Sequence, residues 1–196
     1  MNLPNKITLS RICMIPIFVA VFFLDIIPLR FMIAAIIFAV AACTDFLDGH
    51  IARSRGLVTN LGKFLDPIAD KVLVSTAMIL ILTMGGSLFA MLGTLAFPVY
   101  VAMSICICII MARELIISAF RQIAAANGVI MAAEKLGKYK TACQDVAIFV
   151  LILAADIPAT AGLIFAWVGL GLFALATVLT VVSGIFYVVK NKQVLK

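Results

Sequence analysis

Four aspartates stand close together in a chain that is otherwise strongly apolar. Asp45, Asp48, Asp66 and Asp70 fall between positions 45 and 70, and they are four of the nine acidic residues in the sequence. An ionised carboxylate costs several kcal/mol at membrane depth unless a partner compensates its charge. Because four neighbouring carboxylates repel one another, we expect them to share one or two divalent cations such as Mg²⁺ or Ca²⁺, which prefer oxygen ligands.

The spacing of the aspartates predicts two helix faces. Asp45 and Asp48 are three residues apart, and Asp66 and Asp70 are four apart, so each pair shares one face of a helix. Pro67 leaves a second interpretation open, in which Asp66 is the N-cap and Pro67 the first residue of a helix. Both interpretations place Asp66 and Asp70 near the cytoplasmic start of a third helix, facing the end of the second.

Small and basic residues follow the first two aspartates. Gly49 and Ala52 keep the helix face open, so that a ligand or a neighbouring helix can approach the backbone. Arg53 comes next and can clamp a phosphate group through two parallel hydrogen bonds. One aspartate near a helix end is usually a cap or a solvated residue, and Gly62 alone fits a loop or a packing contact. Four aspartates at these spacings favour a metal site.

The composition is that of a membrane protein. The chain has 196 residues, of which 65% are hydrophobic and 12% charged, and its mean hydropathy is +1.26. This length allows about six spans of about 20 residues with short links and leaves no room for a separate soluble domain. We therefore expect one all-α transmembrane catalytic domain over residues 1–196. No small-residue cleavage site follows the N-terminal apolar run, which is interpreted as a retained first helix.

Apolar runs and turn residues define six expected transmembrane helices. Gly85 and Gly86 are expected to turn the chain, and Asn127 with Gly128 ends the longest helix, which is expected to protrude from the membrane. The helices are predicted at residues 8–24, 29 to beyond 45, 61–84, 88–126, 138–155 and 159–189.

Basic residues gather on one side of the predicted spans. They lie at the N-terminus, after the second and fourth helices and in the C-terminal tail, whereas only Arg30 lies on the opposite side. The positive-inside rule therefore places both termini and the aspartate-rich connection in the cytoplasm. The net charge of +6 fits contact with anionic membrane lipids. Nucleic-acid binding is not expected, because no aromatic residues are interleaved with the basic ones on a soluble face.

Histidine and cysteine offer no alternative chemistry. His50 is the only histidine in the sequence, which argues against a zinc site or a histidine-based nucleophile. The five cysteines lie in apolar segments without paired metal-ligand spacing, and they are interpreted as small buried hydrophobic residues.

Residues 45–70 resemble the signature of the CDP-alcohol phosphotransferase family. That signature reads D-x-x-D-G-x-x-A-R, eight residues, then G-x-x-x-D-x-x-x-D, and every defined position is present. The resemblance covers the whole chain and implies six transmembrane helices, a homodimer and an active site at the cytoplasmic face of a bacterial inner membrane. The matching residues are Asp45, Asp48, Gly49, Ala52, Arg53, Gly62, Asp66 and Asp70.

The resemblance also implies a role for each residue. The four aspartates would hold two divalent ions, Mg²⁺ or Mn²⁺, over the pyrophosphate of CDP-diacylglycerol, and Asp70 would also be the base. Such ions neutralise developing charge and the leaving group in phosphoryl transfer, and a carboxylate can take the proton of the attacking hydroxyl. The residues that would bind the CDP group are Gly49, Ala52, Arg53, Gly62 and Lys63.

A second basic segment is expected to select the attacking alcohol. Five cations lie between positions 113 and 140 on the side of the aspartates, and a phosphorylated acceptor needs them where a neutral one does not. The R-E pair, the G-K-x-K-T run and Gln144 also resemble the bacterial phosphatidylglycerophosphate synthases of this family, which implies sn-glycerol 3-phosphate as acceptor. Anchoring of helix ends to anionic lipid is the alternative. The predicted acceptor-phosphate residues are Arg113, Arg121, Lys135 and Lys138.

Other functions remain open alternatives. Inositol phosphate, serine or phosphatidylglycerol could be the acceptor at the same metal site. A cation-coupled transporter would place its carboxylates near the membrane midplane, in a fold with inverted repeats, whereas these aspartates lie at helix ends and the sequence shows no such repeat. A function as a non-catalytic scaffold would not explain why four aspartates are clustered in an apolar chain.

Overall fold

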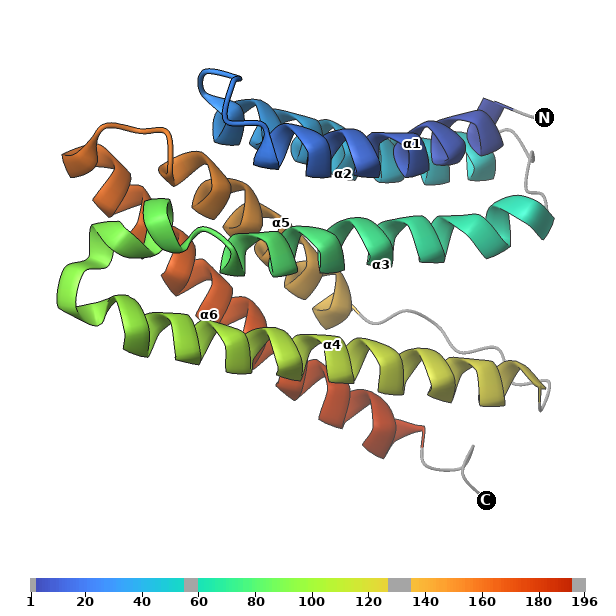
Figure 1. Cartoon of the computed structure of the whole chain (residues 1–196). Helices are drawn as coiled ribbons and strands as arrows, with labels where there is room; N and C mark the ends of the chain where they lie inside the picture. The colour runs from blue at the N-terminus through green and yellow to red at the C-terminus, as the bar shows by residue number, and fades with distance from the viewer. Residues whose placement is uncertain (1–2, 55–59, 127–134, 192–196) are drawn as a thin grey trace.

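The computed structural model describes the backbone of residues 3–54, 60–126 and 135–191, without the side chains of 3–6, 45–54, 60–64, 66, 125–126, 135 and 159. These residues form six α-helices and no strand, which confirms the predicted all-α class (Figure 1). The helices are α1 (Leu3–Phe23), α2 (Arg30–Ser54), α3 (Asn60–Leu82), α4 (Ala96–Ala126), α5 (Lys135–Ala154) and α6 (Ala159–Lys190).

The largest departure from the predicted helices precedes α4. The sequence predicts one helix from residue 88, but a π-helical turn (Gly85–Phe89) and a 3₁₀ helix (Ala90–Leu95) come first, and α4 begins only at Ala96. The cause is Gly93, whose φ of 57° and ψ of −123° lie outside the helical range. Glycine tolerates this conformation because it has no Cβ. The predicted start at residue 88 is therefore wrong.

Two other predictions about helix starts are also corrected. α1 begins at Leu3 and α5 at Lys135, which is earlier than residues 8 and 138. α3 begins at Asn60, so that Pro67 lies inside the helix. The interpretation of Asp66 as an N-cap is therefore wrong, and the helical interpretation, with Asp66 and Asp70 on one face, is retained.

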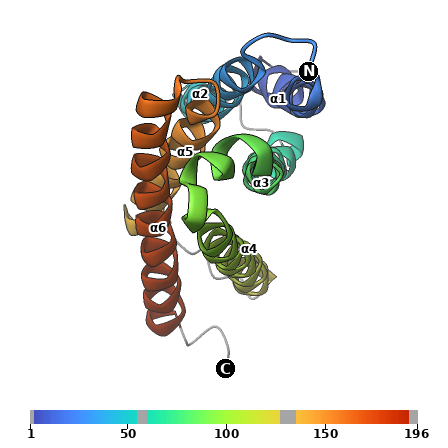
Figure 2. The same cartoon turned by 60° about the vertical axis from the view of Figure 1, so that its left-hand side comes forward.

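Two helix pairs and α3 build the bundle. α1 packs along α2, α5 packs along α6, and α3 contacts both pairs. α4 packs against α6, and the two views show it on the far side of α3 from α1 (Figure 1, Figure 2). Gly169 of α6 allows the close approach to α5, because a Cβ at this position would lie 2.8 Å from the Leu151 side chain.

A few polar side chains lie inside the mainly apolar core of the bundle, and many large apolar side chains lie on its surface. Arg11, Lys140 and Gln144 are at most 4% exposed, whereas Phe97 is 75% exposed and Phe186 60%. Within the part of the chain that the structure describes, two segments are long and apolar enough to cross a membrane, and they are Gly85–Ala124 and Thr160–Lys190. Together with the composition, this distribution indicates a membrane protein, because a lipid-facing surface favours apolar residues.

One tertiary contact fixes the start of α2. Asp156, in the turn between α5 and α6, accepts a hydrogen bond from the backbone N–H of Met32 at 2.8 Å. Met32 belongs to the first turn of α2, where the N–H groups have no partner within the helix. Asp156 therefore caps α2 from a distant part of the chain, and its charge is favourable at a helix N-terminus.

Replacement of Asp156 by alanine should weaken this contact between α2 and the turn that joins α5 and α6. Loss of a capping side chain costs about 1 kcal/mol, so we expect Asp156→Ala to lower the midpoint of thermal unfolding in detergent by a few degrees. Asp25→Ala is the control, because Asp25 pairs with Arg30 while 87% of its side chain is exposed, and surface pairs contribute little. An equal loss in both variants would contradict the cap.

Candidate active site

α2 and α3 carry the aspartate signature without a break. α2 is helical through residues 45–53 and α3 through residues 62–70, so the backbone has the spacings that place each aspartate pair on one face. The two helices contact each other, and the last turn of α2 lies at the same end of the bundle as the first turn of α3 (Figure 1). Asp70 has a described side chain. The other signature side chains lie outside the described part, and they are those of Asp45, Asp48, Gly49, Ala52, Arg53, Gly62, Lys63 and Asp66.

The chemistry of the signature fits hard divalent cations. Four carboxylates on adjoining helices supply oxygen ligands only, and oxygen ligands suit Mg²⁺ and Mn²⁺. The side chains that the structure describes contain no group of three or more His, Cys, Asp or Glu that could hold a metal. Since three of the four aspartates are outside that set, metal coordination stays a prediction.

Arg11 is fully buried next to the start of the signature. Its Nε donates to the carbonyl oxygen of Ala41 at 3.1 Å and to Thr44 Oγ1 at 3.5 Å. Thr44 directly precedes Asp45, so Arg11 ties α1 to the turn of α2 that leads into the first aspartate. In the sequence, Arg11 is one of the N-terminal basic residues that are used only to orient the chain, although a cation inside an apolar helix needs an internal partner.

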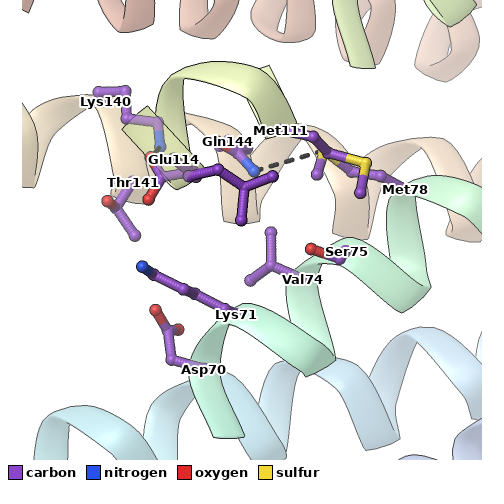
Figure 3. Close-up of a pocket in the computed structure, with 11 residues that line it drawn as sticks. Asp70, Lys71, Val74, Ser75, Met78, Met111, Glu114, Lys140, Thr141 and Gln144 are labelled. Atoms are coloured by element: carbon purple, nitrogen blue, oxygen red, sulfur yellow. Dashed lines mark hydrogen bonds and ion pairs between the residues drawn. The ribbon is translucent and has the colours of Figure 1, made fainter. Parts of the chain in front are cut away.

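Asp70 lines a pocket between α3, α4 and α5 that encloses about 110 Å³ (Figure 3). Lys71 lies beside Asp70 on α3, and both side chains extend toward Glu114 of α4 and Thr141 of α5. The apolar part of the wall is formed by Val74, Met78, Met111 and Leu115. The pocket therefore joins a polar region next to Asp70 to an apolar region deeper in the bundle.

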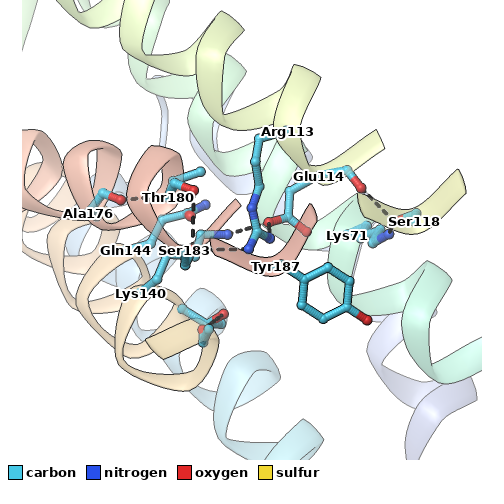
Figure 4. A network of polar contacts seen from close by, with 12 residues as sticks. Lys71, Arg113, Glu114, Ser118, Lys140, Gln144, Ala176, Thr180, Ser183 and Tyr187 are labelled. Carbon is cyan, nitrogen blue, oxygen red and sulfur yellow. Dashed lines mark hydrogen bonds and ion pairs between the residues drawn. The ribbon is translucent and has the colours of Figure 1, made fainter. Parts of the chain in front are cut away.

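Glu114 is the centre of a network of charged side chains (Figure 4). Its Oε1 accepts hydrogen bonds from Lys140 Nζ at 2.5 Å and from Arg113 Nη1 at 3.0 Å. Lys71 donates to Ser118 Oγ, which in turn donates to the backbone oxygen of Glu114 at 2.5 Å. Because Lys140 is only 4% exposed, its charge depends on this carboxylate. Cations from α3, α4 and α5 thus converge on Glu114, near Asp70.

The two arginines predicted to bind the acceptor both contact α6. Arg113 Nη2 donates to Ser183 Oγ at 3.1 Å, and a Cβ at Gly184 would come within 3.1 Å of Arg113 Cγ. Arg121 Nε donates to Tyr187 Oη at 3.2 Å, and its guanidinium carbon lies 5.3 Å from the centroid of that ring, which is a cation–π contact. Both arginines therefore contribute to the packing of α4 on α6.

The described cations that line the Asp70 pocket are Lys71 and Lys140. Lys138 is exposed, and the side chain of Lys135 lies outside the described part. The sequence prediction omitted Lys71 and Glu114 from the site, and it counted Lys140 among the five cations without naming it as an acceptor-phosphate residue. One signal was available, since Lys140 and Gln144 are four residues apart and share a face of α5.

Comparisons with known proteins identify the class. The sequence model of the family described as CDP-alcohol phosphatidyltransferase matches residues 1–189, and the chain belongs to this family. It is 37% identical to the CDP-diacylglycerol–glycerol-3-phosphate 3-phosphatidyltransferase of Bacillus subtilis (strain 168), over 100% of this chain and 97% of the relative. It is 39% identical to the protein of the same name from Escherichia coli (strain K12), over 95% and 92%. Arabidopsis thaliana has a relative at 36% identity, over 89% and 76%.

Removal of the Glu114 charge should destabilise the fold. Glu114→Gln leaves Lys140 and Arg113 without their shared carboxylate, which we expect to cost about 1–3 kcal/mol and to lower the thermal midpoint by several degrees. The double variant Glu114→Gln/Lys140→Met removes the stranded lysine and should recover part of the loss. Purely additive losses in the double variant would contradict the pairing.

Proposed function

We propose that the protein transfers the phosphatidyl group of CDP-diacylglycerol to sn-glycerol 3-phosphate and releases phosphatidylglycerophosphate and CMP. The observation that carries this proposal is the position of Asp70, the last aspartate of an unbroken helical signature, in a pocket that also contains Lys71 and Lys140. A carboxylate that can accept a proton therefore lies beside cations that can bind a phosphate. The names of the relatives describe the same transfer.

The nucleotide end of the site is assigned to the signature. We assign two Mg²⁺ or Mn²⁺ ions to Asp45, Asp48, Asp66 and Asp70, where they would neutralise the pyrophosphate and the departing CMP. The residues assigned to the CDP group are Gly49, Ala52, Arg53, Gly62 and Lys63. Arg11 supports this end of the site from α1 through its hydrogen bonds to Ala41 and Thr44.

Asp70 is assigned the proton-transfer step. The hydroxyl oxygen of the acceptor attacks the β-phosphorus of CDP-diacylglycerol, the bond from that phosphorus to CMP breaks, and the hydroxyl proton passes to the Asp70 carboxylate. Asp70 borders the pocket, so an acceptor held there is within reach of it. The apolar walls formed by Val74 and Met111 limit access of competing water.

The acceptor phosphate is assigned to the cations around Glu114. Lys140 and Lys71 border the pocket, and Arg113 contributes by holding Glu114 beside Lys140. The remaining predicted cations lie toward the ends of α4 and α5, where they would guide the approach of the phosphate. These cations are Arg121, Lys135 and Lys138.

The lysines of the pocket favour a phosphorylated acceptor. Serine has no phosphate to pair with Lys71 and Lys140. Inositol phosphate has the charge but a bulkier ring. A cation-coupled transporter is disfavoured, because its carboxylates would lie near the membrane midplane whereas the signature lies at the adjoining ends of α2 and α3.

The membrane arrangement is part of the proposal. We place all six helices across a bacterial cytoplasmic membrane, with both termini and the active site at the cytoplasmic face and with the chain acting as a homodimer. The support is the distribution of Lys and Arg, which follows the positive-inside rule, and the exposed apolar side chains on α1, α4 and α6.

An acceptor panel tests the reaction. Purified protein in detergent, given CDP-diacylglycerol and Mg²⁺, should release CMP with sn-glycerol 3-phosphate at least about 100-fold faster than with serine, because only the phosphorylated acceptor pairs with the buried lysine. Inositol phosphate should be intermediate or inactive. Equal rates with all three acceptors would refute the assignment.

The same assay tests the assignment of Asp70. Asp70→Asn should lower CMP release by about 100-fold or more, because the amide can neither take the proton nor bind a divalent cation as a carboxylate does. Asp156→Asn serves as the matched control, since Asp156 caps α2 through Met32 and lies outside the pocket. Full activity in Asp70→Asn would exclude this aspartate as the base.

A further inference from the structure

Gln144 presents a buried carbonyl oxygen that has no partner within the described part of the chain. The side chain is 3% exposed and lines the Asp70 pocket. Its Nε2 donates to the sulfur of Met78 at 3.5 Å, whereas Oε1 is buried without a hydrogen bond. Figure 3 shows the amide nitrogen and the dashed line that joins it to the sulfur of Met78. Gln144 therefore lines the pocket and carries a buried carbonyl oxygen without a described hydrogen-bond partner.

The orientation of the amide group is set by Met78. A thioether sulfur accepts a hydrogen bond weakly and donates none, so the N–H group is the end that belongs beside it. Turning the amide over would bring two acceptors together and would still leave one polar end without a partner. A buried polar group without a hydrogen bond is costly, and native proteins rarely retain one without a functional reason.

Gln144 lies one helical turn after Lys140 on the same face of α5. Side chains at this spacing start about 5–6 Å apart, which suits a phosphate and a hydroxyl carried by neighbouring carbons. Lys140 is held by Glu114 through one of its three N–H groups, and Lys71 of α3 faces the same space. α5 thus presents a cation and an amide carbonyl one turn apart beside the same pocket.

We propose that Gln144 determines acceptor specificity by accepting a hydrogen bond from the hydroxyl on the carbon next to the phosphate-bearing carbon. This inference rests on the proposed transfer to a glycerol phosphate. The phosphate pairs with Lys140, the middle hydroxyl donates to Gln144 Oε1, and the terminal hydroxyl is left for Asp70. The ligand class is a small alkyl phosphate with a hydroxyl beside the phosphate-bearing carbon. A phosphate without that hydroxyl leaves the Gln144 carbonyl buried and unpaired, and a site of this kind discriminates strongly.

Two acceptors that differ by one hydroxyl test the proposal. The wild-type protein should use sn-glycerol 3-phosphate with a kcat/KM at least about tenfold higher than that for 3-hydroxypropyl phosphate, which lacks the middle hydroxyl. Gln144→Met has a similar volume and suits the contacts with Met78 and Met111. It should lower kcat/KM for glycerol 3-phosphate about tenfold and leave that for 3-hydroxypropyl phosphate within about twofold.

Thermal unfolding gives a second readout that does not depend on activity. Because Gln144 Oε1 has no described partner, Gln144→Met should unfold at the wild-type midpoint or above it. Gln122→Met, at an exposed position of α4, is the matched control. It should leave kcat/KM unchanged for both acceptors. A Gln144→Met protein that fails to fold, or that loses activity equally with both acceptors, overturns the proposal in favour of a structural role. Unchanged discrimination overturns it as well.

The outcome is separable from that of the proposed function. If the wild-type protein releases no CMP with sn-glycerol 3-phosphate, the proposed transfer itself fails. If the wild-type protein is active and Gln144→Met discriminates between the two acceptors as well as the wild type does, only the role of Gln144 fails.

Discussion

The constraint on which the structure depends is the cost of a charge inside an apolar bundle. Each buried ionised group needs an internal partner, since neither lipid nor an apolar core supplies one. Glu114 meets this need for Lys140 and Arg113, and backbone and hydroxyl oxygens of α2 meet it in part for Arg11. These same contacts tie α1 to α2 and link α4 to α5. The polar interactions that permit burial therefore also position the site.

Three helices each supply a different part of the site. α3 supplies Asp70 from the face that carries the signature, α4 supplies the carboxylate of Glu114, and α5 supplies Lys140 and Gln144 one turn apart. Metal and nucleotide chemistry is assigned to the ends of α2 and α3, whereas the choice of acceptor is assigned to α4 and α5. Such a division lets one metal site serve different alcohols, because the acceptor wall can change without altering the aspartates.

Local sequence signals predicted the helical part of the site well. The three- and four-residue spacings of the aspartates required α2 and α3 to be continuous, and both are. The start of α4 was missed because Gly93 breaks the helix at a point where the apolar pattern continues. The side of α4 that Arg113 and Arg121 occupy depends on contacts with Ser183, Gly184 and Tyr187 of α6. The spacing of residues within one helix does not predict contacts with a helix so distant in sequence.

The central claim is that the acceptor phosphate binds in the Asp70 pocket at Lys140. The most direct measurement compares the KM values of Lys140→Met and Arg121→Met for sn-glycerol 3-phosphate and for CDP-diacylglycerol. Lys140→Met should raise the acceptor KM about tenfold or more and leave the KM for the lipid unchanged, while Arg121→Met, whose side chain contacts Tyr187, should have a much smaller effect. A larger acceptor effect for Arg121→Met than for Lys140→Met would contradict the account.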